Sequence, residues 1–134
     1  MSPDNARAHV RAEAARSDES LRAAHALLAV GLFSDAVSRA YYAAMHLARA
    51  LLLTEGVDPR THGGVGSMLG MHFVVTGRLA PERAKELARL EQFRAEADYN
   101  RFFVFTREGA EEEVAAADRF CAAARALLGT WLAQ

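Results

Sequence analysis

Apolar residues in this chain recur every three or four positions, and this spacing constrains the fold more than any other feature. The first such repeat consists of Val10, Ala14, Ser17, Leu21, Ala24 and Leu28. The spacing places these residues on one face of an α-helix, which must pack against another helix. The composition agrees, because the 134 residues include 29 Ala and 15 Leu, both strong helix formers, and no Ile.

Breaks in the repeat divide the chain into five predicted helices. We expect them at about residues 3–30, 34–55, 62–75, 81–99 and 107–131, with Ser34 or Asp35 as N-cap of the second and Thr106 as N-cap of the last. Residues 100–105 (NRFFVF) lose the helical period and predict an aromatic-rich connection. No strand pattern, repeat or long linker is visible. The sequence therefore predicts an all-α antiparallel bundle in a single domain spanning residues 1–134.

Composition and net charge exclude several classes of function. The formal net charge is -1, so any contact with RNA must come from a local group of arginines rather than from a global basic excess. The chain has no apolar run long enough for a membrane span, no visible secretory signal and a single cysteine, which together predict a cytoplasmic protein. It also lacks a phosphate-binding loop after a strand and a histidine pair at the spacing of a helical zinc site. We therefore expect neither a cofactor nor a metal.

Arg94 stands on the apolar stripe of the fourth predicted helix, between Leu90 and Ala97. A guanidinium that faces the interior of a bundle is costly unless it is paired, and Asp98 lies at the spacing of a helical ion pair. Two interpretations follow. The pair is a structural link between helices, or Asp98 holds Arg94 in a cleft where its planar donors suit phosphate oxygens.

The second predicted helix carries a polar stripe of Arg39, Tyr42, His46 and Arg49, while Tyr41 falls on its inward apolar stripe. Guanidinium, phenol and imidazole groups on one helix face are typical of acid–base chemistry or of a site for an anionic ligand. The alternative is a solvated face with Tyr42 half-buried at its edge.

Four segments carry a set of motifs in a fixed order: Ser38–His46 (SRAYYAAMH), Ala50–Leu52, Thr61–Gly63 and Arg94–Tyr99 (RAEADY). In this order they resemble the HEPN domain family, and most closely its stand-alone branch, over about residues 21–128. The resemblance implies an antiparallel helical bundle that forms a homodimer. Many members of the family are metal-independent RNases or toxins that are paired with a minimal nucleotidyltransferase antitoxin.

The resemblance also assigns roles to residues. Arg94 corresponds to the arginine of the family's active motif, in which a histidine follows four to six residues later. Here Tyr99 and Arg101 occupy those places, and no histidine follows His72. The RNase motif is therefore degenerate, and because tyrosine is a poor general base near neutral pH, we predict little or no RNA cleavage.

His62 and Tyr99 are the remaining candidates. His62, in the turn before the third predicted helix, is a surrogate base if it approaches Arg94, and otherwise a structural contact at the helix N-terminus. In some relatives the antitoxin attaches nucleotides to a tyrosine beside the motif, which makes Tyr99 a candidate acceptor.

Two functions follow from these observations. The first is an RNA- or nucleotide-associated module, the toxin-type component of a pair with a nucleotidyltransferase. The second is a non-catalytic scaffold module that holds a nucleotide or a partner protein through the region of Arg39 and Arg94. The most informative structural observation is whether Arg39, His46, His62, Arg94 and Tyr99 converge in one site.

Overall fold

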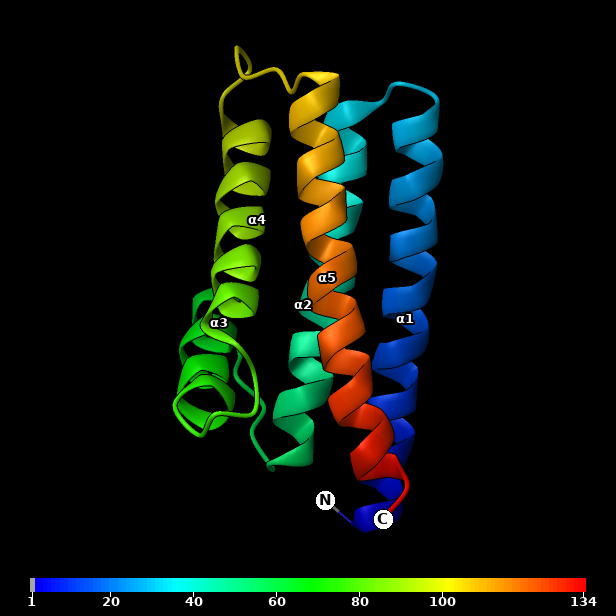
Figure 1. Ribbon diagram of the computed structural model, residues 1–134, viewed down its shortest axis with the longest axis vertical. Helices are drawn as coiled ribbons and strands as arrows, with labels where there is room; N and C mark the ends of the chain where they lie inside the picture. Colours follow the sequence, from blue (N-terminus) through cyan, green and yellow to red (C-terminus); the bar gives the residue numbers. More distant parts are fainter. Residues whose placement is uncertain (1) are drawn as a thin grey trace.

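The computed structural model, which describes residues 2–134, contains five α-helices and one π-helical turn (Figure 1). They are α1 (Pro3–Ala29), α2 (Phe33–Thr54), α3 (His62–Leu69), η1 (Gly70–Val74), α4 (Pro81–Tyr99) and α5 (Arg107–Leu132). This part of the chain has no strand, so the all-α prediction is confirmed. None of the helices described is both long enough and apolar enough to cross a bilayer.

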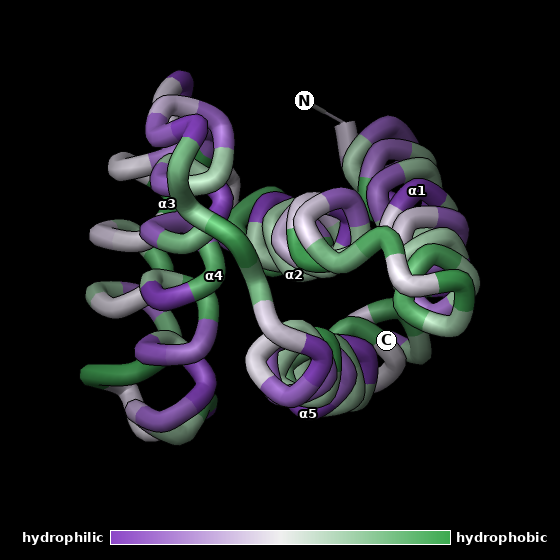
Figure 2. Tube along the Cα trace, turned by 90° about the horizontal axis from the view of Figure 1, so that it is seen from above, coloured by the Kyte–Doolittle hydropathy of each residue, from purple (hydrophilic) through white to green (hydrophobic). Residues whose placement is uncertain are grey.

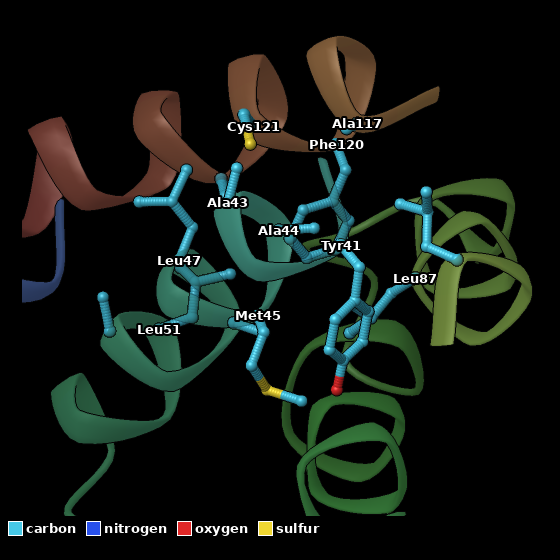
Figure 3. Close-up of a cluster of buried hydrophobic side chains, with 14 of the residues drawn as sticks. Tyr41, Ala43, Ala44, Met45, Leu47, Leu51, Leu87, Ala117, Phe120 and Cys121 are labelled. Atoms are coloured by element: carbon cyan, nitrogen blue, oxygen red, sulfur yellow. The ribbon is translucent and has the colours of Figure 1, made fainter. Parts of the chain in front are cut away.

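The central helix of the bundle is α2. More than half of its 22 residues are buried, and it contacts α1, α3, α4 and α5. Figure 2 shows α5 against one side of α2, with α1 and α4 on its two flanks. In the close-up of Figure 3, Ala43, Ala44 and Leu47 of α2 share one apolar cluster with Phe120 and Cys121 of α5. The many alanines of α2 let the neighbouring backbones approach closely, so this helix fixes where its neighbours lie.

The start of α2 differs from the prediction. The N-cap is Leu32, whose side chain makes no capping hydrogen bond, and not Ser34 or Asp35. Tertiary packing overrides the local signal here, because Phe33 packs on a second apolar cluster and the guanidinium of Arg107 lies 5.0 Å from its ring centroid. The helix therefore begins at Phe33. Thr106 is the N-cap of α5 as predicted, and its Oγ1 accepts a hydrogen bond from the Gly109 backbone N–H at 3.0 Å.

The third predicted helix changes its hydrogen-bonding pattern in the middle. It runs as α3 to Leu69 and continues as the π-helical turn η1 to Val74. Val65, Leu69 and Phe73 are all buried, so the chain keeps one apolar face across the change. At the start of α3 the Thr61 hydroxyl accepts a hydrogen bond from the Gly64 backbone N–H at 2.9 Å. This cap fixes the position of His62, the first residue of the helix.

Charged residues attach α4 to α5. Few apolar side chains of α4 are buried, and Glu86 is buried with them. Arg119 of α5 donates to Glu86 at 2.7 Å, and Arg89 of α4 donates to Glu113 of α5 at 3.0 Å. Removing one partner of such a pair leaves a buried charge uncompensated, so the two pairs hold α4 in register against α5. That register in turn positions Arg94.

Candidate anion-binding site

The ring of Tyr41 joins residues from three helices. It extends from α2 beside Leu87 of α4, with its hydroxyl directed toward α3 (Figure 3). The Tyr41 hydroxyl lies 2.6 Å from Nδ1 of His62. The ring of Tyr42 stands edge-on to that of Tyr41, with the two centroids 5.1 Å apart.

Arg94 reaches the same ring from α4. Its Cζ lies 5.0 Å from the centroid of Tyr41, which is a cation–π contact, and its Nη1 donates to Asp98 Oδ2 at 2.8 Å. The Arg94 side chain is only 16% exposed, against 49% for Asp98. Arg94 Nε is buried without an acceptor, which is uncommon for a buried polar atom. We call Tyr41, Tyr42, His62, Arg94 and Asp98 the Tyr41 cluster.

Burial of the Tyr41 side chain determines whether its hydroxyl is protonated. Desolvation, with a smaller contribution from the Glu91 carboxylate, raises the pKa of Tyr41 well above its ordinary value, although the charge of Arg94 opposes the shift. Tyr41 therefore keeps its proton. Its hydroxyl shares a hydrogen bond with His62 Nδ1, which leaves Nε2 as the ring nitrogen of His62 that can meet a ligand.

Arg49 of α2 lies between the Tyr41 cluster and α1. Its charge is among those that oppose the raised pKa of Tyr41, and it also contributes to the lowered pKa of Glu13 on α1. The Nε of Arg49 is buried without an acceptor, as is that of Arg94. Two guanidiniums with an unmet donor, Arg49 of α2 and Arg94 of α4, therefore lie close enough to Tyr41 for their charges to act on it.

Arg39 and His46 lie on the opposite flank of α2, away from Arg94. They line a groove of about 560 Å³ between α1 and α2, which we call the α1–α2 groove; its lining residues are Arg16, Glu19, Ser20, Ala23, Ala26, Leu27, Arg39 and His46. His46 Nδ1 lies 2.7 Å from Glu13 Oε2. This hydrogen bond lowers the pKa of Glu13, against the desolvation that raises it, and the charges of His46, Arg49 and Arg16 act in the same direction as the hydrogen bond.

The structure brings some of the predicted site residues together and separates others. His62 and Arg94 both contact Tyr41, and Tyr42 lies beside them. Tyr99 is 87% exposed at the end of α4. Sequence analysis treated Tyr41 as a core residue and missed its role as the common contact. The sequence contains one indication of this role, the hydroxyl of Tyr41, because a tyrosine on a buried stripe needs a hydrogen-bond partner.

Other reactive groups lie outside the Tyr41 cluster. Cys121 is buried, and desolvation raises the pKa of its thiol to about 11, so the thiol stays protonated near neutral pH. Within residues 2–134, no three His, Cys, Asp or Glu side chains are grouped as metal ligands would be. The Tyr41 cluster itself offers the hydrogen-bonding groups of Tyr42 and His62 and one guanidinium, that of Arg94, which Asp98 pairs with.

Comparisons with known proteins agree with the motifs. The HEPN domain family matches residues 11–127. The chain is 42% identical to "UPF0332 protein PH1297" of Pyrococcus horikoshii over 85 residues, which is 63% of this chain and 57% of that protein. It is 41% identical to "Putative toxin MJ0605" of Methanocaldococcus jannaschii over 83 residues, 62% of each chain.

A second protein of Methanocaldococcus jannaschii, "Putative toxin MJ0142", is 32% identical over 96 residues, which is 72% of this chain and 65% of that protein. The matched segments thus span less than two thirds of the length of each of these three relatives.

Proposed function

We propose, because this chain belongs to the HEPN domain family, that its Tyr41 cluster binds the phosphate backbone of RNA. The observation that carries the proposal is the convergence of Arg94 from α4 and His62 from α3 on one ring of α2. Asp98 and the Tyr41 ring hold the guanidinium in one orientation. An oriented guanidinium is a strong donor to phosphate oxygens, and contacts to phosphates supply most of the affinity of such complexes.

The cluster favours binding over cleavage. Attack by a ribose 2′-hydroxyl needs a base to accept its proton, and arginine does not accept protons near neutral pH. Nδ1 of His62 is engaged by the Tyr41 hydroxyl, so Nε2 is its one ring nitrogen left to meet a ligand. The degenerate motif, with Tyr99 in place of a histidine, supplies no other base. We therefore propose an RNA-binding module that cleaves RNA weakly or not at all when purified alone.

Incubation of the chain with labelled single-stranded RNA in EDTA tests this proposal, with binding followed by fluorescence anisotropy and cleavage by gel electrophoresis. We expect binding without cleavage. Arg94→Gln is expected to weaken binding about tenfold, as for loss of one charge-assisted contact, and Arg94→Lys to weaken it less, because the charge remains without the planar fork. Arg11→Gln on the exposed part of α1 is the control and should bind like the wild type.

Two outcomes contradict the proposal. Arg94→Gln binding with the same affinity as Arg11→Gln would remove the Tyr41 cluster from RNA binding. Cleavage by the wild type that disappears in His62→Ala would identify His62 as a base and overturn the claim of binding alone.

The names of two relatives describe them as toxins, and this supports a toxin-type role for the present chain. The pairing with a nucleotidyltransferase that we propose beside it rests on the family resemblance alone. The exposure of Tyr99 supports it as the residue that such a partner modifies.

In this modification the tyrosine oxygen attacks the α-phosphate of a nucleoside triphosphate, and pyrophosphate leaves. Coexpression with a minimal nucleotidyltransferase should increase the intact mass by one or more nucleotides in the wild type but not in Tyr99→Phe. Equal mass gains in both chains would exclude Tyr99 as the acceptor.

A further inference from the structure

We propose that the α1–α2 groove binds a second nucleotide unit of the same RNA strand, with Arg16 and Arg39 contacting its phosphates. This inference rests on the proposed function, because it extends the strand from the Tyr41 cluster across α2 to α1. It assigns a ligand to a groove that is separate from Arg94.

The groove offers the two kinds of surface that a nucleotide needs. Its volume of about 560 Å³ is within the usual range of small-molecule sites. Ala23, Ala26 and Leu27 give it an apolar wall against which a base can pack, and Arg16 and Arg39 add two exposed guanidiniums. Since Nδ1 of His46 is bound to Glu13, Nε2 is the ring nitrogen that remains for a ligand.

Three arginines on this part of the molecule are left without an ion pair, whereas Arg22 of α1 pairs with Asp18. Among residues 2–134, Arg16, Arg39 and Arg49 make no ion pair with a carboxylate. On the α4–α5 side the arginines are paired instead, as Arg89 with Glu113 and Arg119 with Glu86 show. Glu19 lines the groove but does not pair with its two arginines. Arg16 and Arg39 are thus exposed in the groove without a carboxylate partner, while Arg49 of α2 is half-buried.

A strand can connect the two sites over α2. Figure 2 shows α1 and α4 on opposite flanks of α2 and α5 on a third side, while α3, which also contacts α2, lies toward the α4 flank; Tyr42, His46 and Arg49 of α2 remain half-buried. An α-helix with its side chains is about 10 Å wide, which a few nucleotides span. Tyr42 of the Tyr41 cluster and Arg49 of α2 are both half-buried and can contact a base and a phosphate on the way.

The test compares a dinucleotide with an oligouridylate of about twelve nucleotides, a length in the range that single-strand sites accommodate. Binding is measured by fluorescence anisotropy at several salt concentrations for the wild type, Arg16→Gln, Arg39→Gln and Arg94→Gln. Arg11→Gln is the matched control, because it removes an equal charge from an exposed position of α1 outside the groove. Circular dichroism confirms that each variant keeps its helices.

We expect Arg16→Gln and Arg39→Gln each to weaken binding of the oligouridylate roughly fivefold and to reduce the slope of log K against log salt by about 0.7, with little effect on the dinucleotide. Arg94→Gln should weaken binding of both RNAs.

The groove proposal would be wrong, and the proposed function would stand, if Arg16→Gln and Arg39→Gln bound the oligouridylate with the same affinity as Arg11→Gln while Arg94→Gln still weakened binding. If the wild type bound neither RNA, both would fail. Displacement of the oligouridylate from the groove by a polyglutamate peptide of equal charge would also overturn the proposal, in favour of an acidic protein partner.

Discussion

At the scale of single residues, the candidate site depends on polar side chains that the surrounding packing holds in one orientation. Tyr41 is the clearest case: its ring packs among apolar side chains, while its hydroxyl fixes the orientation of His62. The same hydrogen bond leaves Nε2 of His62 to meet a ligand. A tyrosine on an apolar stripe is therefore part of the site, although its spacing alone predicts only burial.

Glu13 allows a residue-scale prediction about pH. Its pKa is lowered below 4.5 in the folded protein, chiefly by the hydrogen bond from His46, with Arg16 and Arg49 nearby. A lowered folded-state pKa stabilises the fold above the unfolded value and loses that contribution as pH falls through the folded one. We expect Glu13→Gln to reduce the free energy of unfolding by roughly 1–2 kcal/mol at neutral pH. The difference from the wild type should shrink as the pH falls below about 4.5.

Thermal unfolding followed by circular dichroism across this pH range provides the measurement. Glu111→Gln, at an exposed glutamate of α5, is the control and should leave the pH dependence unchanged. A difference for Glu13→Gln that stayed constant down to the lowest pH would contradict the assignment of the lowered pKa to this residue.

At the scale of elements, the sequence predicts the helices well because apolar spacing and caps are local signals. Spacing also placed Arg94 on an inward stripe beside Asp98, where the structure has it. Two features escaped prediction. The early start of α2 depends on the packing of Phe33 against residues far along the chain, and the π-helical turn follows no local signal that we identified.

The site itself was only partly predictable for the same reason. The contact between Tyr41 and His62 spans two helices and the turn between them, and the α1–α2 groove exists only once α1 lies against α2. The spacing of the stripe predicts a single polar face of α2, formed by Arg39, Tyr42, His46 and Arg49. The packing of α2 divides it, so that Tyr42 belongs to the Tyr41 cluster while Arg39 and His46 line the groove. The helical spacing of a residue predicts the side of the helix on which it lies. The site to which it belongs depends on the helices that pack against that side.

At the scale of the whole molecule, charge is arranged in two ways. Between α4 and α5, buried carboxylates pair with arginines and hold the helices together. Along α1 and α2, Arg16, Arg39 and Arg49 make no ion pair, although Arg22 pairs with Asp18. The net charge of -1 conceals this division, because ten of the 17 acidic residues belong to α4 and α5 and five to α1 and α2. A homodimer, which the family resemblance implies, stays a prediction.

The central claim is that RNA binds at the Tyr41 cluster, and mapping of backbone amide chemical shifts by NMR during titration with a short single-stranded RNA in EDTA tests it most directly. We predict that the largest shift changes fall on Tyr41, Tyr42, His62 and Arg94 and saturate with the RNA, while amides around Glu86 and Arg119 at the α4–α5 contact stay unchanged. Saturable changes confined to the α4–α5 contact, or the absence of any change at RNA concentrations well above that of the protein, would contradict the account.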